Sequence, residues 1–202
     1  GSVMLPKAPT IVVSVLQTAQ EAGMGVEYVE TNSSWYRDRE QACGLLGHLR
    51  NVGLSTLLVS ISPLHNEYIP FAKVKGVIRA CQQSGISVFP WISEFAADLD
   101  VFDEYQRHSL EEYQAYFGPD YIRSIPQRYW ISMGGRSLET FGPYVLAQTV
   151  PELVQQSQHG CTELNEVNHF HLDLFGNYVP GLCAGLAIRA SDLGCELDPD
   201  EY

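Results

Sequence analysis

The sequence predicts an α/β fold in which a parallel sheet carries helices on its outer face. Three segments, residues 26–32, 55–62 and 86–92, have the length and composition of strands. Residues 55–62 contain the apolar run Leu57-Leu58-Val59 followed by Ile61, which is typical of a strand buried on both faces. Amphipathic helices are expected between the strands, over residues 37–50 and 71–84. Strands that alternate with helices over short connections form parallel sheets.

The remaining elements are expected on both sides of this core. A helix is predicted over residues 9–22, with Thr10 as its N-cap and Gly23 as its stop. Beyond residue 98 the pattern is less regular, with helices expected over 103–117, 138–148 and 151–158. The whole chain, residues 1–202, is expected to form one domain. Its expected parts are a leader (3–8), regular β/α units (9–95), an irregular helical segment (98–160) and a final strand and tail (161–202).

Composition limits the class of protein. The net charge of −12 argues against nucleic acid and anionic membranes as partners and leaves a small molecule as the expected one. No apolar run is long enough to cross a bilayer, and no basic and apolar leader is recognisable. The five cysteines include no CxxC pair, which disfavours disulfides, a zinc ribbon and an iron–sulfur cluster. A cytoplasmic protein is therefore expected.

Polar side chains follow each of the three expected strands. Chemistry in parallel sheets collects at the carboxyl ends of the strands, so these side chains are candidates for a site. They are Glu30 and Asn32 at the end of the first strand, Ser60 and Ser62 at the end of the second with His65 in the loop that follows, and Glu94 just after the third.

A metal site is suggested by a fourth segment, residues 169–175. Its alternating pattern predicts a strand with His169, His171 and Asp173 on one face and apolar side chains on the other. Imidazole and carboxylate are ligands of zinc and of other divalent first-row metals. His65 or Glu94 would complete the ligand set. The alternative is that the two histidines only hydrogen-bond within a buried polar network.

Residues 26–92 resemble the middle of the core of a radical S-adenosylmethionine (SAM) enzyme. Glu30-Thr31-Asn32 is similar to the third-strand motif of that family, and Ser60-Ile61-Ser62 to the strand that contacts the SAM ribose. The resemblance extends to residues 169–185. The CxxxCxxC cluster loop and the glycine-rich GGE segment of the family are both absent from this sequence.

The resemblance implies a partial (β/α) barrel that lacks its first strands and holds no iron–sulfur cluster. The strand over residues 26–32 would then be an open edge, and an open edge invites pairing with a second copy as a homodimer.

The sequence leaves two kinds of function open. The first is a metal-dependent hydrolase, with zinc as the expected metal, that cleaves ester or phosphoester bonds. His169, His171, Asp173 and His65 would bind the metal, with Glu30 and Glu94 as catalytic groups. The second is a non-catalytic remnant that binds SAM or a nucleoside through Glu30, Asn32, Ser60 and Ser62. The chain could also be a fragment of a longer radical SAM enzyme.

Overall fold

The computed structural model describes residues 8–129, 131, 136–145, 148–156, 170–173, 175–180 and 187–196. The chain divides into two compact units, residues 1–145 and residues 146–202. The sequence predicts one domain with four parts, which is a finer division than these two units. That domain and its four parts stay predictions. No helix among the described residues is long and apolar enough to span a bilayer.

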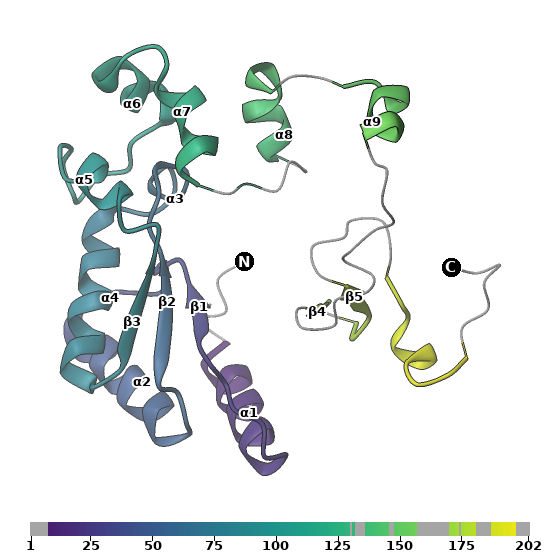
Figure 1. The fold of residues 1–202 in the computed structure, drawn as a ribbon. Coiled ribbons are helices and arrows are strands. Elements are labelled where there is room, and N and C mark those ends of the chain that lie inside the picture. Colours follow the sequence, from purple (N-terminus) through teal and green to yellow (C-terminus); the bar gives the residue numbers. More distant parts are fainter. Residues whose placement is uncertain are drawn as a thin grey trace. The chain divides into compact units, whose positions relative to one another are not determined.

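The first unit is built on a three-stranded parallel sheet in the order β1-β2-β3 (Figure 1). The strands are β1 (Val29–Thr31), β2 (Thr56–Ser60) and β3 (Ser87–Trp91). Residue Glu30 pairs with Leu58, and Leu58 pairs with Phe89, so these three side chains form one row on the same face. The predicted α/β fold with a parallel sheet is confirmed at this level.

Helices α2 (Arg39–Asn51) and α4 (Phe71–Ser84) connect the strands and lie together against one face of the sheet (Figure 1). The side chain of Asp38 caps α2 by accepting a hydrogen bond from the backbone N–H of Gln41 at 2.9 Å. Gly85 ends α4 in the left-handed conformation, at φ 66°. The apolar faces of both helices join Leu57 and Val59 of β2 in one buried core.

Further helices surround this sheet. Helix α1 (Ala8–Glu21) precedes β1 and contributes Val12 and Leu16 to the core. Five short helices and a 3₁₀ turn of the first unit follow β2 or β3: α3 (Pro63–Asn66) after β2, and α5 (Phe95–Leu99), α6 (Leu110–Phe117), α7 (Tyr121–Arg128), α8 (Arg136–Phe141) and η1 (Gly142–Tyr144) after β3. The second unit contains α9 (Val150–Gln156), β4 (Phe170–Leu172), β5 (Tyr178–Pro180) and η3 (Ala190–Asp192).

Three element predictions need correction. Thr10 lies inside α1, which already begins at Ala8. Residues 103–109 are not helical. The Asp103 side chain accepts a hydrogen bond from the backbone N–H of Tyr105 at 2.9 Å, and Glu104 pairs with Lys75 of α4. The α-helix expected over residues 138–148 ends at Phe141, because Pro143 has no backbone N–H to continue the α-helical hydrogen bonds, and the chain continues as the 3₁₀ turn η1.

The fourth predicted strand also differs from the expectation. Strand β4 covers only Phe170–Leu172 and pairs antiparallel with β5, in a sheet separate from β1-β2-β3. Its three side chains are all exposed. An alternating pattern is compatible with either kind of pairing, so the antiparallel hairpin could not be predicted from it. His169 lies outside the described residues.

Candidate functional site

The carboxyl end of β1 presents Glu30 and then turns sharply. Thr31 is buried, and its hydroxyl accepts hydrogen bonds from the backbone N–H of Ser33 and from the Trp35 indole. The Asn32 side chain accepts a hydrogen bond from the backbone N–H of Ser34 at 3.1 Å. Ser33 has a left-handed backbone, at φ 67°. Asn32 therefore shapes this turn, while the Glu30 side chain is exposed.

The carboxyl end of β2 lies beside Glu30 and leads into α3. The Ser60 hydroxyl is directed at Glu30, with 3.4 Å between Ser60 Oγ and Glu30 Oε1. Ser62 caps α3, and its hydroxyl lies 2.7 Å from His65 Nδ1. Burial lowers the pKa of His65, and the negative charge of Glu30 partly offsets this effect. Glu30, Ser60, Ser62 and His65 thus gather at one edge of the sheet.

Ser62 is almost completely buried, so its hydroxyl acts on the His65 ring and on the α3 backbone. A hydrogen bond to Nδ1 fixes the orientation of an imidazole and leaves Nε2 for another partner. Because its pKa is lowered, His65 is neutral near pH 7. This arrangement supplies a positioned neutral imidazole at the sheet edge.

Glu94, at the end of β3, is oriented toward a different neighbour. Its backbone carbonyl accepts a hydrogen bond from Arg128 at 3.4 Å. The hydrogen bond from Arg128 to Asp98 is the main cause of the raised pKa of Arg128, and the charge of Glu94 adds a smaller contribution. Arg128 also pairs with Asp98 of α5. Ile92, two residues before Glu94, has a left-handed backbone at φ 58°. The interactions recorded for Glu94 are thus with Arg128 and not with Glu30 or His65.

A cavity of about 390 Å³ opens on the sheet face opposite α2 and α4. Leu58 lies at its centre, with Glu30 on one side and Trp91 on the other. Aromatic rings continue across this face. Tyr28 meets Phe89 at 6.1 Å between ring centroids, Phe89 meets Trp91 at 5.9 Å, and Trp91 meets Tyr129 at 6.4 Å. Ile131 and Ser137 complete the lining.

The cavity contains residues that sequence reasoning did not select. Tyr28 precedes Glu30 by two positions, and Phe89 precedes Trp91 by two. Alternation along a strand therefore places each pair on one face, which is the signal that points to them. Tyr129, Ile131 and Ser137 come from the segment around α7 and α8, for which no comparable pattern exists.

The metal ligands expected from residues 169–175 lie in the second unit. Asp173 closes the β4-β5 turn, where one of its oxygens accepts hydrogen bonds from the backbone N–H groups of Phe175 and Asn177 at 2.8 and 2.9 Å. Its other oxygen accepts from the Asn177 side chain, and these bonds lower the pKa of Asp173. His171 is exposed on β4. Within the described ranges, no three His, Cys, Asp or Glu side chains form a group that could hold a metal ion.

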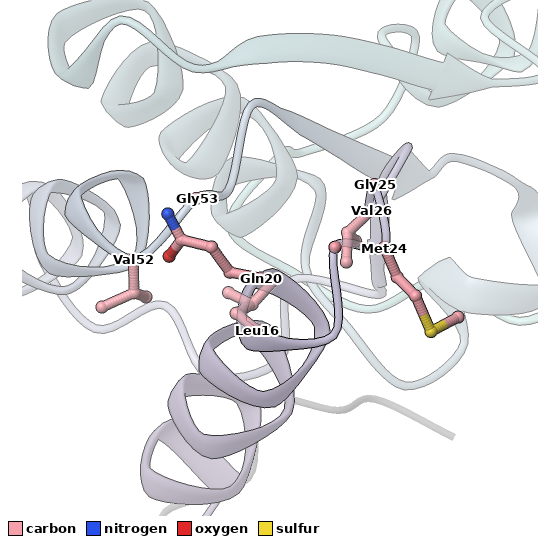
Figure 2. A pocket seen from close by; sticks show the side chains of 8 residues that line it. Leu16, Gln20, Met24, Gly25, Val26, Val52 and Gly53 are labelled. Atoms are coloured by element: carbon pink, nitrogen blue, oxygen red, sulfur yellow. The ribbon is translucent and has the colours of Figure 1, made fainter.

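A second cavity, of about 450 Å³, lies at the opposite end of the sheet. Figure 2 shows it between the last turn of α1 and the segment after α2, with Met24 pointing away from the other side chains. Leu16, Val26 and Val52 make it apolar, and Gln20 is the polar side chain in its lining. It carries no ionisable group, and it lies where parallel sheets do not usually bind ligands.

Comparisons with protein-family models, with curated proteins and with solved structures find no match to this chain.

Proposed function

We propose that this chain binds a nucleoside-type small molecule on the open face of its sheet, at the carboxyl edge. The observation that carries the proposal is the cavity in which the Glu30 carboxylate stands beside Leu58 and a row of aromatic rings. Its volume of about 390 Å³ lies within the range of small-molecule sites. A carboxylate at this place in an α/β sheet commonly accepts hydrogen bonds from a ribose diol.

Aromatic and charged groups suit the two ends of such a ligand. Trp91 and Tyr129 line the cavity and would stack with a base, and base–aromatic stacking contributes about 1–3 kcal/mol. Ser60 donates toward Glu30 and so helps to orient its carboxylate. The acidic chain and Glu30 disfavour a phosphorylated ligand, whereas the sulfonium of SAM carries a compatible positive charge. The proposal agrees with the resemblance to radical SAM enzymes. In this proposal the open sheet is part of a partial barrel.

Isothermal titration with adenosine and SAM tests this proposal, with 2′,3′-dideoxyadenosine as the ligand control. The wild type is expected to prefer adenosine over the dideoxy compound by about tenfold, which corresponds to about 1.4 kcal/mol. Glu30→Gln should abolish this preference, while Glu27→Gln, an exposed carboxylate just before β1, should retain it. An undiminished preference in Glu30→Gln, or no binding of either adenosine or SAM, would contradict the proposal.

A zinc-dependent hydrolase of esters or phosphoesters is the second candidate. The observation in its favour is that His171 and Asp173 share one hairpin. His169, on the same segment of the sequence, would add a ligand, and bound zinc would supply hydroxide at neutral pH. His65 belongs to the first unit and is not part of this ligand set. Both Asp173 oxygens already accept hydrogen bonds, which ranks this candidate below the first. Metal analysis of the purified wild type and of His171→Ala tests it, since unchanged metal content rules out this ligand set.

We also propose that two copies pair through the free edge of β1. Among the described strands, β1 pairs only with β2, so one side of its backbone has no strand partner. Light scattering coupled to size-exclusion chromatography distinguishes a dimer from a monomer. Protection of the β1 amides from hydrogen exchange that rises with protein concentration would locate the contact at this edge.

A further inference from the structure

A third cavity, of about 350 Å³, lies between α3 and α8 in the first unit. Its ionisable lining consists of one guanidinium, one imidazole and two carboxylates, from Arg136, His65, Glu67 and Glu139. Leu64, Phe141 and the Tyr68 ring supply apolar surface. Such a combination of a small apolar volume with a few charged groups is typical of a site for a small molecule.

Two of the polar groups are held in place by neighbours. The Arg136 guanidinium lies 5.6 Å from the centroid of the Tyr68 ring and donates a hydrogen bond to the Tyr68 hydroxyl at 3.0 Å. The Ser62 hydroxyl holds His65 Nδ1 at 2.7 Å. Fixed donors and acceptors lose less entropy when a ligand binds, so these contacts prepare the cavity for a polar partner.

The charges in the lining select the class of ligand. A phosphate would face two carboxylates, and a simple amine would face the Arg136 guanidinium. A zwitterion satisfies both signs, because its carboxylate can pair with Arg136 while its ammonium pairs with Glu67 or Glu139. Glu67 already accepts a hydrogen bond from the backbone N–H of Leu110, at 3.4 Å from one of its oxygens, which leaves Glu139 as the more available acceptor.

The His65 imidazole suits a zwitterion in either tautomer. If Nδ1 donates to Ser62, Nε2 accepts a hydrogen bond from an ammonium group. If Nδ1 accepts from Ser62, Nε2–H donates to a carboxylate. The lowered pKa of His65 keeps the ring neutral near pH 7, so neither arrangement places a second positive charge beside Arg136.

We propose that this cavity binds a free α-amino acid with an apolar side chain, its carboxylate on Arg136, its ammonium on Glu139 and its side chain against Leu64 and Phe141. The volume of about 350 Å³ lies at the low end of the range for ligand sites and fits a ligand of this size. The site is separate from the one proposed for nucleosides, although Ser137 lines both cavities. The two proposals can therefore fail independently.

The test compares L-phenylalanine with two molecules that each lack one charged end, 3-phenylpropionate and 2-phenylethylamine, by isothermal titration of the full chain. L-leucine, L-methionine and L-valine complete the panel. We expect at least one of the four amino acids to bind, and L-phenylalanine to bind at least about tenfold more tightly than either half-ligand. Half-ligands that bind as tightly as the amino acid, or no binding by any amino acid at millimolar concentration, would overturn the proposal.

Variants at both charged ends locate the site. Arg136→Gln is expected to weaken amino acid binding by about tenfold or more, and Glu139→Gln to weaken it to a similar extent. Arg107→Gln, at an exposed arginine outside the cavity, is the matched control and should bind as the wild type does. Equal binding by Arg136→Gln and the wild type overturns the assignment, and Glu139→Gln tests it independently if Arg136→Gln does not fold.

Adenosine titration of the same variants separates the two sites. Arg136→Gln should bind adenosine as the wild type does, and Glu30→Gln should bind L-phenylalanine as the wild type does. If each substitution instead impairs both ligands to the same extent, the two cavities act as one site and the separate amino acid site is wrong.

Discussion

At the scale of single residues, two residues with strained backbones lie at the carboxyl edge of the sheet, where nucleoside binding is proposed. Ser33 and Ile92 have left-handed backbones, at φ 67° and φ 58°, and they follow β1 and β3 almost directly. This conformation is unfavourable for residues other than glycine, and most of all for a β-branched side chain such as Ile92. Strained residues persist where the surrounding structure holds them in place, and they are found frequently at functional sites. Here they reverse the chain directly after the strands that carry Glu30 and Trp91.

Ser33 allows a direct test of this strain. Its hydroxyl is buried and has no hydrogen-bond partner among the described residues. Ser33→Gly removes two costs to the folded state, the left-handed backbone of a residue other than glycine and the buried hydroxyl without a partner. Glycine also makes the unfolded chain more flexible, which offsets part of the gain in stability. We expect the free energy of unfolding to rise by about 1 kcal/mol, measured by urea denaturation.

Ser34→Gly is the matched control for this prediction. Ser34 is the next residue, and its φ is not positive, so glycine offers it no relief. We expect this variant to be less stable than the wild type by up to about 1 kcal/mol. The account of strain fails if Ser33→Gly destabilises the protein as much as Ser34→Gly does.

At the scale of elements, a glycine on α4 allows the segment after β1 to pack closely. The Tyr36 ring lies directly over Gly76, where a Cβ atom would overlap with it. Gly76 is buried in the middle of α4, a position at which glycine normally weakens a helix. The close contact with Tyr36 explains why glycine is present there.

Gly76→Ala is therefore expected to destabilise the protein, although alanine is the better helix former. The overlap with Tyr36 should lower the free energy of unfolding by about 1–3 kcal/mol, measured by thermal or urea denaturation. Gly44→Ala on α2 is the control, because a Cβ atom there meets nothing within 4 Å. That substitution should stabilise the protein by about 0.5–1 kcal/mol. Stabilisation by both substitutions would show that Tyr36 moves aside without cost.

Some helices could be predicted from the sequence with their bounds, and others could not be predicted at all. Helix α4 has the predicted bounds, since Pro70 precedes it and Gly85 ends it. Helix α7 was not predicted. It contains Pro126, and a proline inside a segment argues against a helix there. Buried Tyr121 and the pair between Arg128 and Asp98 stabilise it through tertiary contacts.

Part of the candidate site could be predicted from the sequence and part could not. Glu30 and Ser60 lie near the carboxyl ends of β1 and β2 and His65 follows β2, and the carboxyl ends of parallel strands meet at one edge. The aromatic side of the cavity was not predicted, because Tyr129 reaches it through tertiary packing. The metal prediction depended on the alternation over residues 169–175, and alternation does not distinguish a parallel strand from the antiparallel hairpin that contains Asp173.

At the scale of the whole molecule, stability and charge are concentrated in different units. The buried core extends from Val12 to Phe141, entirely within the first unit. None of the described residues after 145 is buried. Residues 146–202 contain nine acidic residues and one basic residue, Arg189, and so carry eight of the twelve net negative charges. The first unit therefore has the core of a stable domain and a smaller charge.

We predict that residues 1–145 fold without the second unit. The fragment keeps the whole described core, so its thermal transition by circular dichroism should be cooperative, with a midpoint within about 5 °C of the first-unit transition in the full chain. A shorter fragment, residues 1–118, is the control, because it lacks the buried side chains of Tyr121, Ile125 and Phe141. This shorter fragment should show no cooperative thermal transition, or a transition with a midpoint at a much lower temperature than that of residues 1–145. If residues 1–145 behave like the shorter fragment, the second unit contributes contacts that the first needs, and the core described here is not sufficient for folding.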